Sequence, residues 1–354
     1  MTHSQQIERI KTPNPGAATS EQTPIEVSII VLNFNGRTWL ERCLPAALAE
    51  VSLDCELLVV DNGSNDGSAE FVAQAFPAVR LASMATNLGF AGGNNAGAHV
   101  ARGRYLAFLN NDAAPQPGWL AKLRAALHAR PDAGLAASCI VYLDRPSIVD
   151  SAGDGMTRFG GAFKRFHGQP VSEALTARDV FGACGAACLI RKELFDEVGG
   201  FDSAYFAVHE DVDLSYRCQL HGFSCVYVPD AVVHHAGSAT LGRVSARSVF
   251  WGQRNLEWTY FKTTPWPLLA ITLPGHLLYN LAAAAHFARA GHFRTFVSAK
   301  WQAMRALPRV LRQRRGIQQR RRATSRQLWK LMDGRWLAIK LREKRFDLGL
   351  KTAA

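Results

Sequence analysis

Three carboxylates, Glu210, Asp211 and Asp213, lie within four residues of one another in the segment His209-Glu-Asp-Val-Asp-Leu214. One of them could act as a general base, because a neighbouring negative charge raises the pKa of a carboxyl group and strengthens its conjugate base. The alternative is structural, since acidic side chains are also favoured in the first turn of a helix. The segment therefore predicts either a base or a helix start.

A single acid, Asp61, ends an apolar run and is followed by Asn-Gly-Ser-Asn-Asp-Gly-Ser at 62–68. A carboxylate at a strand end can accept hydrogen bonds from a nucleobase N–H group or from ribose hydroxyls. The glycines would let backbone N–H groups come close to a ligand. A tight turn that caps the following helix explains the same residues equally well.

The third cluster is rich in glycine and reads Asn-Leu-Gly-Phe-Ala-Gly-Gly-Asn-Asn-Ala-Gly from Asn87 to Gly97. Glycine-rich backbone that opens a helix suits an anion, here a diphosphate. The segment has neither the Gly-Lys-Ser/Thr of a P-loop nor the spacing of a dinucleotide fingerprint. The alternative is a flexible surface turn.

Two further clusters contain metal-ligand residue types. Asn110-Asn111-Asp112 offers a carboxylate flanked by amide oxygens, which suits a hard divalent cation such as Mg²⁺ or Mn²⁺ shared with substrate phosphates. The alternative for this segment is a loop or a helix N-cap. His234 and His235 follow an apolar run and could ligate a metal, although a lone histidine is more often a hydrogen-bonded core residue.

The elements that position these clusters alternate as in an α/β fold. Continuous apolar runs rich in β-branched residues predict buried parallel strands at 27–32, 56–60 and 105–109. Helices are expected between them, although Pro45 argues against one straight helix over 39–48. The polar clusters then follow the carboxyl ends of strands, where open parallel sheets bind ligands. From about residue 134 the pattern loosens and indicates a mixed half.

Length and composition favour one large domain or a domain with an appendage. The chain has 354 residues, of which 48% are apolar and 20% charged. Residues 1–24 are polar without an apolar period and are expected to be a disordered leader. They lack the apolar core of a secretory signal, and the seven cysteines are irregularly spaced, so we expect a cytosolic protein with reduced thiols.

The net charge of +12 is concentrated at the C-terminal end. Residues 291–354 hold 18 Lys and Arg against 3 Asp and Glu, whereas the preceding part holds 23 basic and 26 acidic groups. With the apolar stretch 265–288 before it, this basic tail predicts attachment to an anionic membrane surface. The alternative is a helical pair packed on the α/β domain. The predicted division is a leader at 1–24, a catalytic domain at 25–260, and an apolar helical segment with a basic tail at 261–354.

The order and spacing of the clusters resemble glycosyltransferase family 2, and in particular its rhamnosyltransferase-like branch, from about Val27 to Ser238. The matching segments are VSIIVLNFNG, VVDNGSNDGS, NLGFAGGNNAG, FLNNDAAP, FGACGAACLIRKELFDEVGGFD, HEDVDLSYR and HHAGSAT. The resemblance implies an α/β domain with the GT-A Rossmann-like fold. It also implies inverting transfer of a sugar, rhamnose or a similar one, from a UDP- or dTDP-sugar to a hydroxyl of a polysaccharide or lipid-linked acceptor.

The resemblance also assigns roles to individual residues. Nucleobase and ribose, donor sugar and phosphates would be held by Asn33, Asn35, Asp61, Asn87, Gly92, Gly93, Asn94, Asn110 and Asn111. Asn110 replaces the first acid of the family's Asp-x-Asp motif, which leaves Asp112 as the metal carboxylate, with His235 as a second metal position. Asp211 matches the catalytic base, and Glu210 and Asp213 would lie on the acceptor side.

In the implied reaction, Asp211 takes the proton of the acceptor hydroxyl as it attacks the anomeric carbon. Mg²⁺ or Mn²⁺ at Asp112 neutralises the leaving diphosphate. One base and no enzyme nucleophile give inversion. We expect the enzyme on the cytoplasmic face of the inner membrane, without nucleic acid as a partner.

Two other functions stay open. A nucleotidyltransferase that makes the activated sugar would use a similar sheet, but the loop Asn33-Phe-Asn-Gly36 lacks the basic residue usual in that class. A non-catalytic scaffold for membranes or polyanions is indicated by the basic tail alone.

Overall fold

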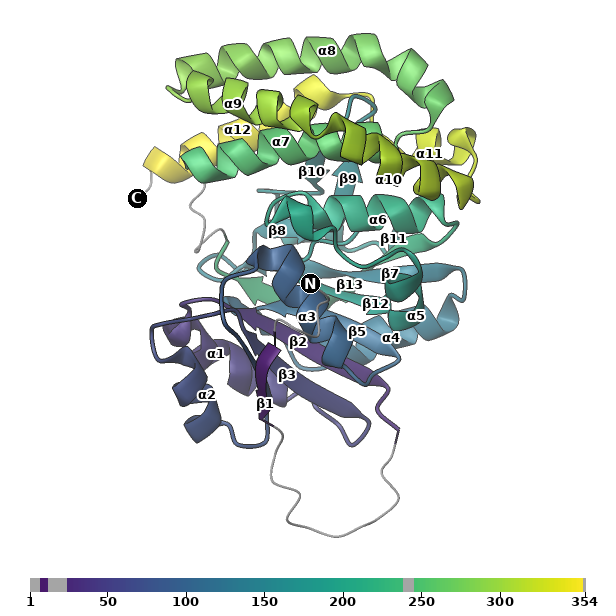
Figure 1. Cartoon of the computed structure of the whole chain (residues 1–354). Helices are drawn as coiled ribbons and strands as arrows, with labels where there is room; N and C mark the ends of the chain where they lie inside the picture. The colour runs from purple at the N-terminus through teal and green to yellow at the C-terminus, as the bar shows by residue number, and fades with distance from the viewer. Residues whose placement is uncertain (1–6, 12–23, 238–244, 353–354) are drawn as a thin grey trace.

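The computed structural model describes residues 7–11, 24–237 and 245–352. In these ranges one large sheet of eleven strands forms the centre of the molecule, and a separate pair of strands lies beside it (Figure 1). Helices cover both faces of the sheet, and a further layer of helices lies over one of these faces. The predicted α/β fold class is confirmed.

The first half of the sheet is parallel. Its strands are β2 (Val27–Asn33), β3 (Cys55–Asp61), β4 (Arg80–Met84) and β5 (Tyr105–Asn110), in the spatial order β4-β3-β2-β5. Three of these are the strands predicted from apolar runs, and nearly all their residues are buried. Because the strands run in one direction, the polar residues that end β2, β3 and β5 meet at one edge of the sheet.

The second half is mixed, as the looser pattern after residue 134 predicted. Strand β12 (Ala187–Arg191) is antiparallel to both β5 and β7 (Ala133–Tyr142), and β13 (Ser224–His235) is parallel to β7. Three short strands complete this half of the sheet: β6 (Ala113–Pro115) on β13, β8 (Val149–Ala152) on β7, and β11 (Arg178–Val180) at the edge. The separate pair consists of β9 (Asp154–Met156) and β10 (Ala162–Lys164).

Two apolar cores hold helices against opposite faces of the sheet. One core includes α1 (Arg37–Leu48), α2 (Ser68–Ala75) and α4 (Trp119–Ala129), and the other includes α3 (Gly89–Val100), α5 (Lys192–Glu197) and α6 (Glu210–Leu220). Pro45 does not interrupt α1, contrary to the prediction. The proline lies close to the C-terminal end of the helix, where only a short stretch follows it.

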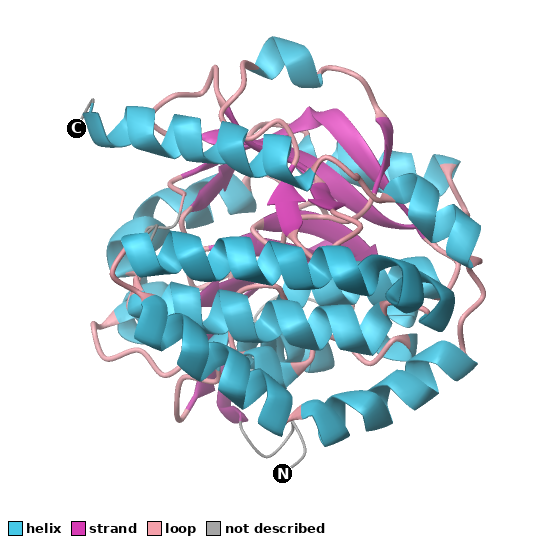
Figure 2. Ribbon diagram, turned by 90° about the horizontal axis from the view of Figure 1, so that it is seen from above, coloured by secondary structure: helices cyan, strands magenta, loops and turns pink. Residues whose placement is uncertain are grey.

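The C-terminal third forms the outer helical layer, which Figure 2 shows from above. Its helices are α7 (Ala246–Thr263), α8 (Trp266–Arg289), α9 (Phe293–Arg305), α10 (Leu307–Gln319), α11 (Ser325–Leu331) and α12 (Trp336–Thr352). Helix α7 contacts α6, α9 and α10, so it joins the layer to the α/β domain. The predicted domain boundary after residue 260 falls near the C-terminal end of α7.

Helix α8 is the one described helix whose length and apolar composition would allow it to cross a membrane. One face of it is nevertheless fixed to the protein through His276. The Nε2 atom of His276 lies 3.0 Å from Oε2 of Glu257 on α7, its Nδ1 lies 2.8 Å from the carbonyl oxygen of Phe159, and its ring stacks on Tyr260. The sequence left two alternatives open for residues 265–288, attachment to a membrane and packing on the α/β domain. One face of the helix packs on the protein, as the second alternative predicted.

Two details of the chain ends differ from the predictions. Residues 7–11, expected to be disordered, form strand β1 (Ile7–Lys11), which pairs with the edge strand β4 in antiparallel register. The rest of the predicted leader, apart from Pro24, lies outside the described residues. In the basic tail, Arg314 is buried and donates to the carbonyl oxygens of Phe261 and Thr264, so its guanidinium serves helix packing.

Candidate active site

The polar residues at the ends of β2, β3 and β5 bond to one another. The Nδ2 atom of Asn33 donates to Oδ1 of Asp61 at 3.2 Å, and Oδ1 of Asn33 accepts from Nδ2 of Asn111 at 2.7 Å. The other oxygen of Asp61 accepts from the backbone N–H of Ser64. The structure thus brings together three of the residues predicted to bind the donor. Asn110 ends β5 beside them and is half-buried.

Asn35 shapes the loop that follows β2. Its φ of 49° is unusual for a residue with a side chain, and its Oδ1 accepts from the backbone N–H of Asn65 at 2.9 Å. The next residue must be glycine, because a Cβ atom at Gly36 would lie 2.1 Å from Nδ2 of Asn111. The loops after β2, β3 and β5 are therefore packed into one connected edge, as a nucleotide site requires.

The glycine-rich segment forms most of helix α3. Gly92 and Gly93 lie inside helix α3, where added Cβ atoms would collide with the side chains of Leu88 and Leu32. Asn94 is buried and donates to the carbonyl oxygen of Phe90 one turn earlier. The donor-binding role that the resemblance implies for these three positions stays a prediction. The flexible-turn alternative is wrong.

Asn87 stands just before α3 and fixes its start. Its Oδ1 accepts from Nδ2 of Asn62 and from the backbone N–H of Gly89, at 3.0 and 2.8 Å. Asn62 follows β3 directly, so this pair ties the helix to the edge of the sheet that carries Asp61. The structure assigns Asn87 a positioning role beside the predicted donor residues.

Asp112 and His235 come together because β6 pairs with the end of β13, which places Ala113 opposite His235. The Nε2 atom of His235 lies 3.2 Å from Oδ1 of Asp112, and its Nδ1 lies 2.8 Å from Oδ2 of Asp150. Burial alone would lower the pKa of His235, but the hydrogen bonds and charges of the two carboxylates outweigh it and raise the pKa to about 9. His234, the neighbour in the strand, lies opposite Ala114.

This arrangement fits a divalent cation. A metal-ligating histidine usually donates its second N–H to a carboxylate, which fixes the ring, and Asp150 takes that position here. The Nε2 lone pair and the carboxylate of Asp112 would then face one ion, which would displace the imidazole proton. Asp150 itself is buried and also pairs with Lys164 at 2.8 Å.

Asp211 opens helix α6, and its carboxylate is held by two backbone N–H groups. Oδ2 accepts from Gly185 at 3.0 Å, and Oδ1 accepts from Val212 at 2.8 Å. Position 185 must be small, because a Cβ atom there would lie 3.3 Å from Cβ of Asp211 and 3.0 Å from the ring of Phe90. Burial raises the pKa of Asp211, which makes the carboxylate a stronger base than a free aspartate.

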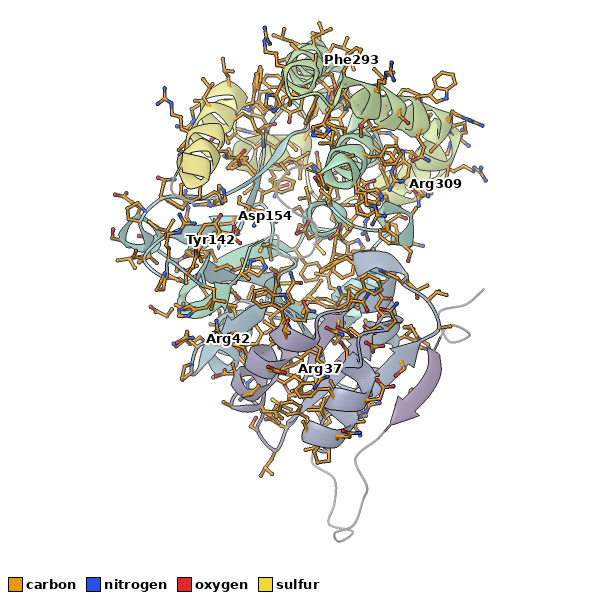
Figure 3. The ribbon with its side chains drawn as sticks, turned by 90° about the vertical axis from the view of Figure 1, so that its left-hand side faces the viewer. Arg37, Arg42, Tyr142, Asp154, Phe293 and Arg309 are labelled. Atoms are coloured by element: carbon orange, nitrogen blue, oxygen red, sulfur yellow. The ribbon has the colours of Figure 1, made fainter. Side chains whose placement is uncertain are left out.

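A second carboxylate, which the sequence analysis did not identify, lies beside Asp211. Ligand atoms of Asp154, Cys184 and Asp211 all lie within 4.8 Å of one another. Figure 3 labels Asp154 between the sheet and the helical layer. Burial and the charge of Asp211 raise the pKa of Asp154 well above its usual value. In the sequence, Asp154 was indicated only by its place between two glycines in the segment Ala152-Gly-Asp-Gly155.

Glu210 is buried, and its Oε2 atom has no hydrogen-bond partner among the described residues. Burial and the charge of Asp211 raise the pKa of Glu210 well above its usual value. Two buried carboxyl groups of raised pKa thus stand side by side at the start of α6. The acceptor-side role predicted for Glu210 stays a prediction.

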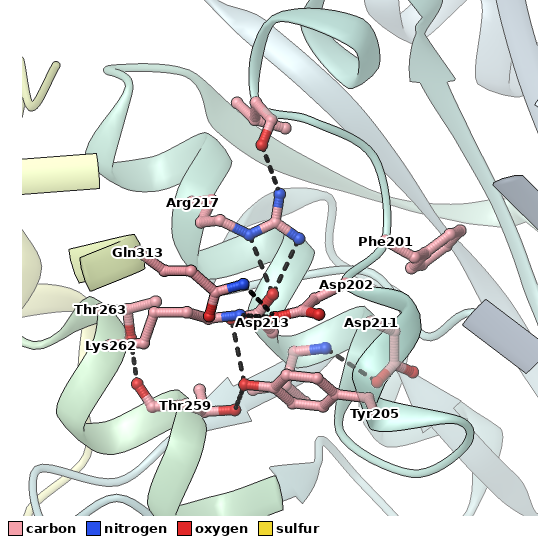
Figure 4. A network of polar contacts seen from close by, with 12 residues as sticks. Phe201, Asp202, Tyr205, Asp211, Asp213, Arg217, Thr259, Lys262, Thr263 and Gln313 are labelled. Atoms are coloured by element: carbon pink, nitrogen blue, oxygen red, sulfur yellow. Dashed lines mark hydrogen bonds and ion pairs between the residues drawn. The ribbon is translucent and has the colours of Figure 1, made fainter. Parts of the chain in front are cut away.

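Asp213, also predicted on the acceptor side, faces the opposite direction (Figure 4). It is completely buried, and its two oxygens lie 2.8 Å from Nζ of Lys262 on α7 and 2.8 Å from Nη2 of Arg217. The hydroxyl of Tyr205 also donates to it. This position is corrected: Asp213 attaches α6 to the helical layer.

Comparisons with known proteins identify the family. The model of Glycosyl transferase family 2 matches residues 28–199. The N-acetylglucosaminyl-diphospho-decaprenol L-rhamnosyltransferase of Mycobacterium tuberculosis is 29% identical over 239 residues, covering 60% of this chain and 76% of that protein. The O-antigen biosynthesis protein RfbC of Myxococcus xanthus is 28% identical over 239 residues, covering 64% of this chain and 18% of that protein.

Solved structures share the fold. GalNAc-T7, solved with UDP, GalNAc and Mn²⁺, aligns with a TM-score of 0.55 at 16% identity, over 68% of this chain and 48% of that one. A mannosyltransferase from Pyrobaculum calidifontis, solved with GDP-Man and Mn²⁺, aligns with a TM-score of 0.51 at 21% identity, over 86% and 88%. The predicted GT-A fold is confirmed. The chain is therefore a glycosyltransferase of family 2, and its similarity is to the rhamnosyltransferase-like branch of that family.

Proposed function

We propose that this enzyme transfers a sugar, rhamnose or a similar one, from a UDP- or dTDP-sugar to an acceptor hydroxyl with inversion of configuration. The observation that carries the proposal is Asp211, a carboxylate of raised pKa fixed by the N–H groups of Gly185 and Val212. A base held in one orientation suits a single displacement, because its free oxygen lone pairs stay directed at the attacking hydroxyl.

The reaction then needs one proton transfer by the protein. The acceptor oxygen attacks the anomeric carbon, the bond from that carbon to the diphosphate breaks, and Asp211 accepts the hydroxyl proton. Burial and the charge of Asp211 raise the pKa of Asp154, which favours its protonated form and would limit charge repulsion around Asp211. Since no enzyme nucleophile takes part, the configuration at the anomeric carbon is inverted.

The donor would lie along the edge formed by β2, β3 and β5. Asp61 and Asn33 offer a carboxylate and an amide to the nucleobase and ribose, with Asn35, Asn110 and Asn111 beside them. Asp112 and His235 would hold Mg²⁺ or Mn²⁺, which neutralises the charge that develops on a leaving diphosphate. The two solved relatives contain Mn²⁺ together with a nucleotide or nucleotide sugar, which supports the same arrangement here.

The acceptor class follows from the names of the relatives. The Mycobacterium tuberculosis protein acts on N-acetylglucosaminyl-diphospho-decaprenol, and the Myxococcus xanthus protein serves O-antigen biosynthesis. We therefore propose a glycan or lipid-linked acceptor for this enzyme.

A donor panel tests the proposal. Purified enzyme with Mn²⁺ would receive UDP- and dTDP-sugars with and without a lipid-linked sugar acceptor, and released nucleoside diphosphate would be measured. We expect release with one nucleotide class, stimulation by acceptor, and an inverted linkage in the product by NMR. Formation of pyrophosphate from a nucleoside triphosphate and a sugar 1-phosphate would instead identify a nucleotidyltransferase.

We further propose that α8 and α9 lie in the plane of an anionic membrane, on its cytoplasmic face, without crossing it. While His276 fixes one side of α8, large apolar side chains on α8 and α9 are exposed: Trp266, Ile271, Leu273, Leu277, Leu278, Leu281, Phe293, Val297, Trp301 and Met304. Exposed apolar patches of this kind mark interaction sites. Exposed arginines follow in the same helical layer, among them Arg289, Arg294, Arg305 and Arg312, and complement anionic headgroups.

Cosedimentation with phosphatidylglycerol-containing and pure phosphatidylcholine vesicles tests this surface. We expect binding to the anionic vesicles, and loss of binding in Leu278→Asp/Trp301→Asp. The matched control is Leu53→Asp, because Leu53 is 92% exposed near α1, away from the helical layer. Equal binding by the double variant and the control, or equal binding to neutral vesicles, would contradict the proposal.

A further inference from the structure

A cavity of ≈930 Å³ lies between the short strands of the mixed half and the last two helices. Its walls come from the β9–β10 pair, from β11 and from α11 and α12 with the loop between them. Gly155 lines it, and the residue before Gly155 is Asp154, which lies beside the base Asp211. The wall of the cavity therefore includes the residue that follows Asp154 in strand β9.

The lining of this cavity is strongly basic. Six cationic side chains line it: Arg158, Arg165, Arg178, Lys330, Arg335 and Arg342. The two acids in the lining already have partners, since Asp179 pairs with Arg130 outside the cavity and Asp333 pairs with Arg335. Within the described part of the chain, the other five cations have no carboxylate within ion-pair distance. The cavity thus offers positive charge that the protein does not itself neutralise.

Two of these arginines are held in place with donors left over. The Nε atoms of Arg158 and Arg165 are buried and have no hydrogen-bond partner among the described residues. The guanidinium of Arg158 stacks on Trp329 at 4.0 Å, which fixes its plane. Burial and the nearby charge of Arg178 lower the pKa of Arg165. Like charges and unsatisfied donors are costly when buried, and a multivalent anion would compensate both.

The remaining lining is apolar and aromatic: Phe163, Phe166, Phe181, Leu331, Met332 and Ile339. A small inorganic anion would use the cations and leave this surface uncovered. A molecule that joins a diphosphate to a hydrocarbon would use both parts of the wall.

We propose that this cavity binds the diphosphate of an acceptor in which a sugar is linked through diphosphate to a prenyl chain. The proposal rests on the proposed sugar transfer, because it places the sugar hydroxyl at Asp211 and the diphosphate among Arg158, Arg165 and Arg178. The cavity is distinct from the donor edge, which lies at the ends of β2, β3 and β5.

Calorimetric titration with geranyl diphosphate as the probe tests the cavity. UDP and dTDP are kept in excess with Mn²⁺, so that a donor site for either nucleotide is filled. We expect binding of geranyl diphosphate, weaker binding of inorganic pyrophosphate, and none of geraniol. Arg165→Gln/Arg178→Gln should weaken binding of the probe at least about tenfold, because each lost guanidinium removes a charge-assisted hydrogen bond.

Matched variants keep the test decisive. Arg42→Gln/Arg104→Gln removes two exposed arginines that do not line the cavity and should leave binding unchanged. Since Arg165 is partly buried, Lys330→Glu/Arg342→Glu serves as a second cavity variant at exposed positions that tolerate substitution. Equal binding by the control and both cavity variants, or displacement of the probe by UDP or dTDP, would overturn the proposal.

The outcome separates this inference from the transfer reaction. Cavity variants that lose geranyl diphosphate binding but still hydrolyse the sugar nucleotide at the parental rate would support an acceptor site apart from the donor site. A parental enzyme that binds geranyl diphosphate in the cavity but releases no nucleoside diphosphate from any donor would support the anion site and contradict the proposed transfer.

Discussion

At the ends of β2 and β3 the polar side chains bond mainly to one another, whereas around the start of α6 carboxyl groups are buried close together. Asp61 accepts from Asn33 and Ser64 and is balanced by neutral donors. Asp211 is instead surrounded by Asp154 and Glu210, whose pKa values its charge helps to raise. The first region is preformed for binding, and the second stores the basicity that a proton transfer needs.

The same contrast appears within α6 itself. Asp211 and Asp213 are two residues apart, which is about 200° around a helix, so they cannot face the same side. Asp211 faces the site, and Asp213 is buried against Lys262 and Arg217. Adjacent acids of one motif therefore serve catalysis and stability separately, and substitutions can distinguish the two roles.

The largest expected effect is that of Asp211→Asn. The amide keeps the shape of the side chain but cannot accept the proton, so kcat should fall by ~10²–10⁴-fold. The Kd for the nucleoside diphosphate should stay unchanged, because the donor lies at the other region. Transfer rates and calorimetry measure the two quantities, with Asp196→Asn on the exposed side of α5 as the control. Near-parental turnover by a folded Asp211→Asn enzyme would exclude this residue as the base.

Asp213→Asn should act on stability. The substitution leaves the buried guanidinium of Arg217 without its carboxylate and removes one of the two carboxylates beside Lys262, which keeps Asp202. Breaking a buried ion pair typically costs about 3–5 kcal/mol. Urea unfolding followed by circular dichroism measures the change. Asp132→Asn, which removes an exposed partner of Arg130, should cost only ~0–1 kcal/mol. Equal stability of the two variants would show that the buried network does not hold α6 to α7.

The proposed metal site at Asp112 and His235 can be tested with Asp150→Asn, which changes neither proposed ligand. Loss of the carboxylate that fixes His235 should weaken Mn²⁺ binding by about 10–100-fold. Electron paramagnetic resonance of free Mn²⁺ reports binding directly, and the Mn²⁺ concentration for half-maximal transfer reports it through activity. The exposed Asp144→Asn is the control. Full activity of the parental enzyme after exhaustive chelation would contradict a metal role altogether.

Much of the first region could be predicted from the sequence, because its signals are local. Strands such as Val27–Asn33 are continuous apolar runs, and the residue that ends each one is polar. The helical conformation of the glycine-rich segment could not be predicted in this way. Glycine usually disfavours a helix interior, but here Gly93 and Gly97 let α3 approach Leu32 and Ile30, so tertiary packing outweighs local propensity.

The second region depends on contacts between distant segments, which a single sequence does not display. Asp154 and Lys164 come from short strands without a clear period and reach the site only through β-pairing with one another. The sequence does contain a signal that distinguishes Asp213 from Asp211. Arg217 stands four residues after Asp213, the spacing of an ion pair on one helix face, and indicates which acid is already neutralised.

We expect the smallest effect from substitution of Asp61, because Asp61 would supply only one of several hydrogen bonds to the nucleotide. A hydrogen bond to a charged group contributes about 1.5–3 kcal/mol, so Asp61→Ala should weaken nucleoside diphosphate binding about tenfold or more. Asp61→Asn separates binding from folding, because the amide oxygen can still accept from Asn33 or Ser64 while the charge is lost. If Asp61 contacts the ligand, both variants lose affinity by calorimetry. If it only holds the loop, Asp61→Asn binds like the parent and Asp61→Ala alone is impaired, which would move Asp61 from the donor site to its support.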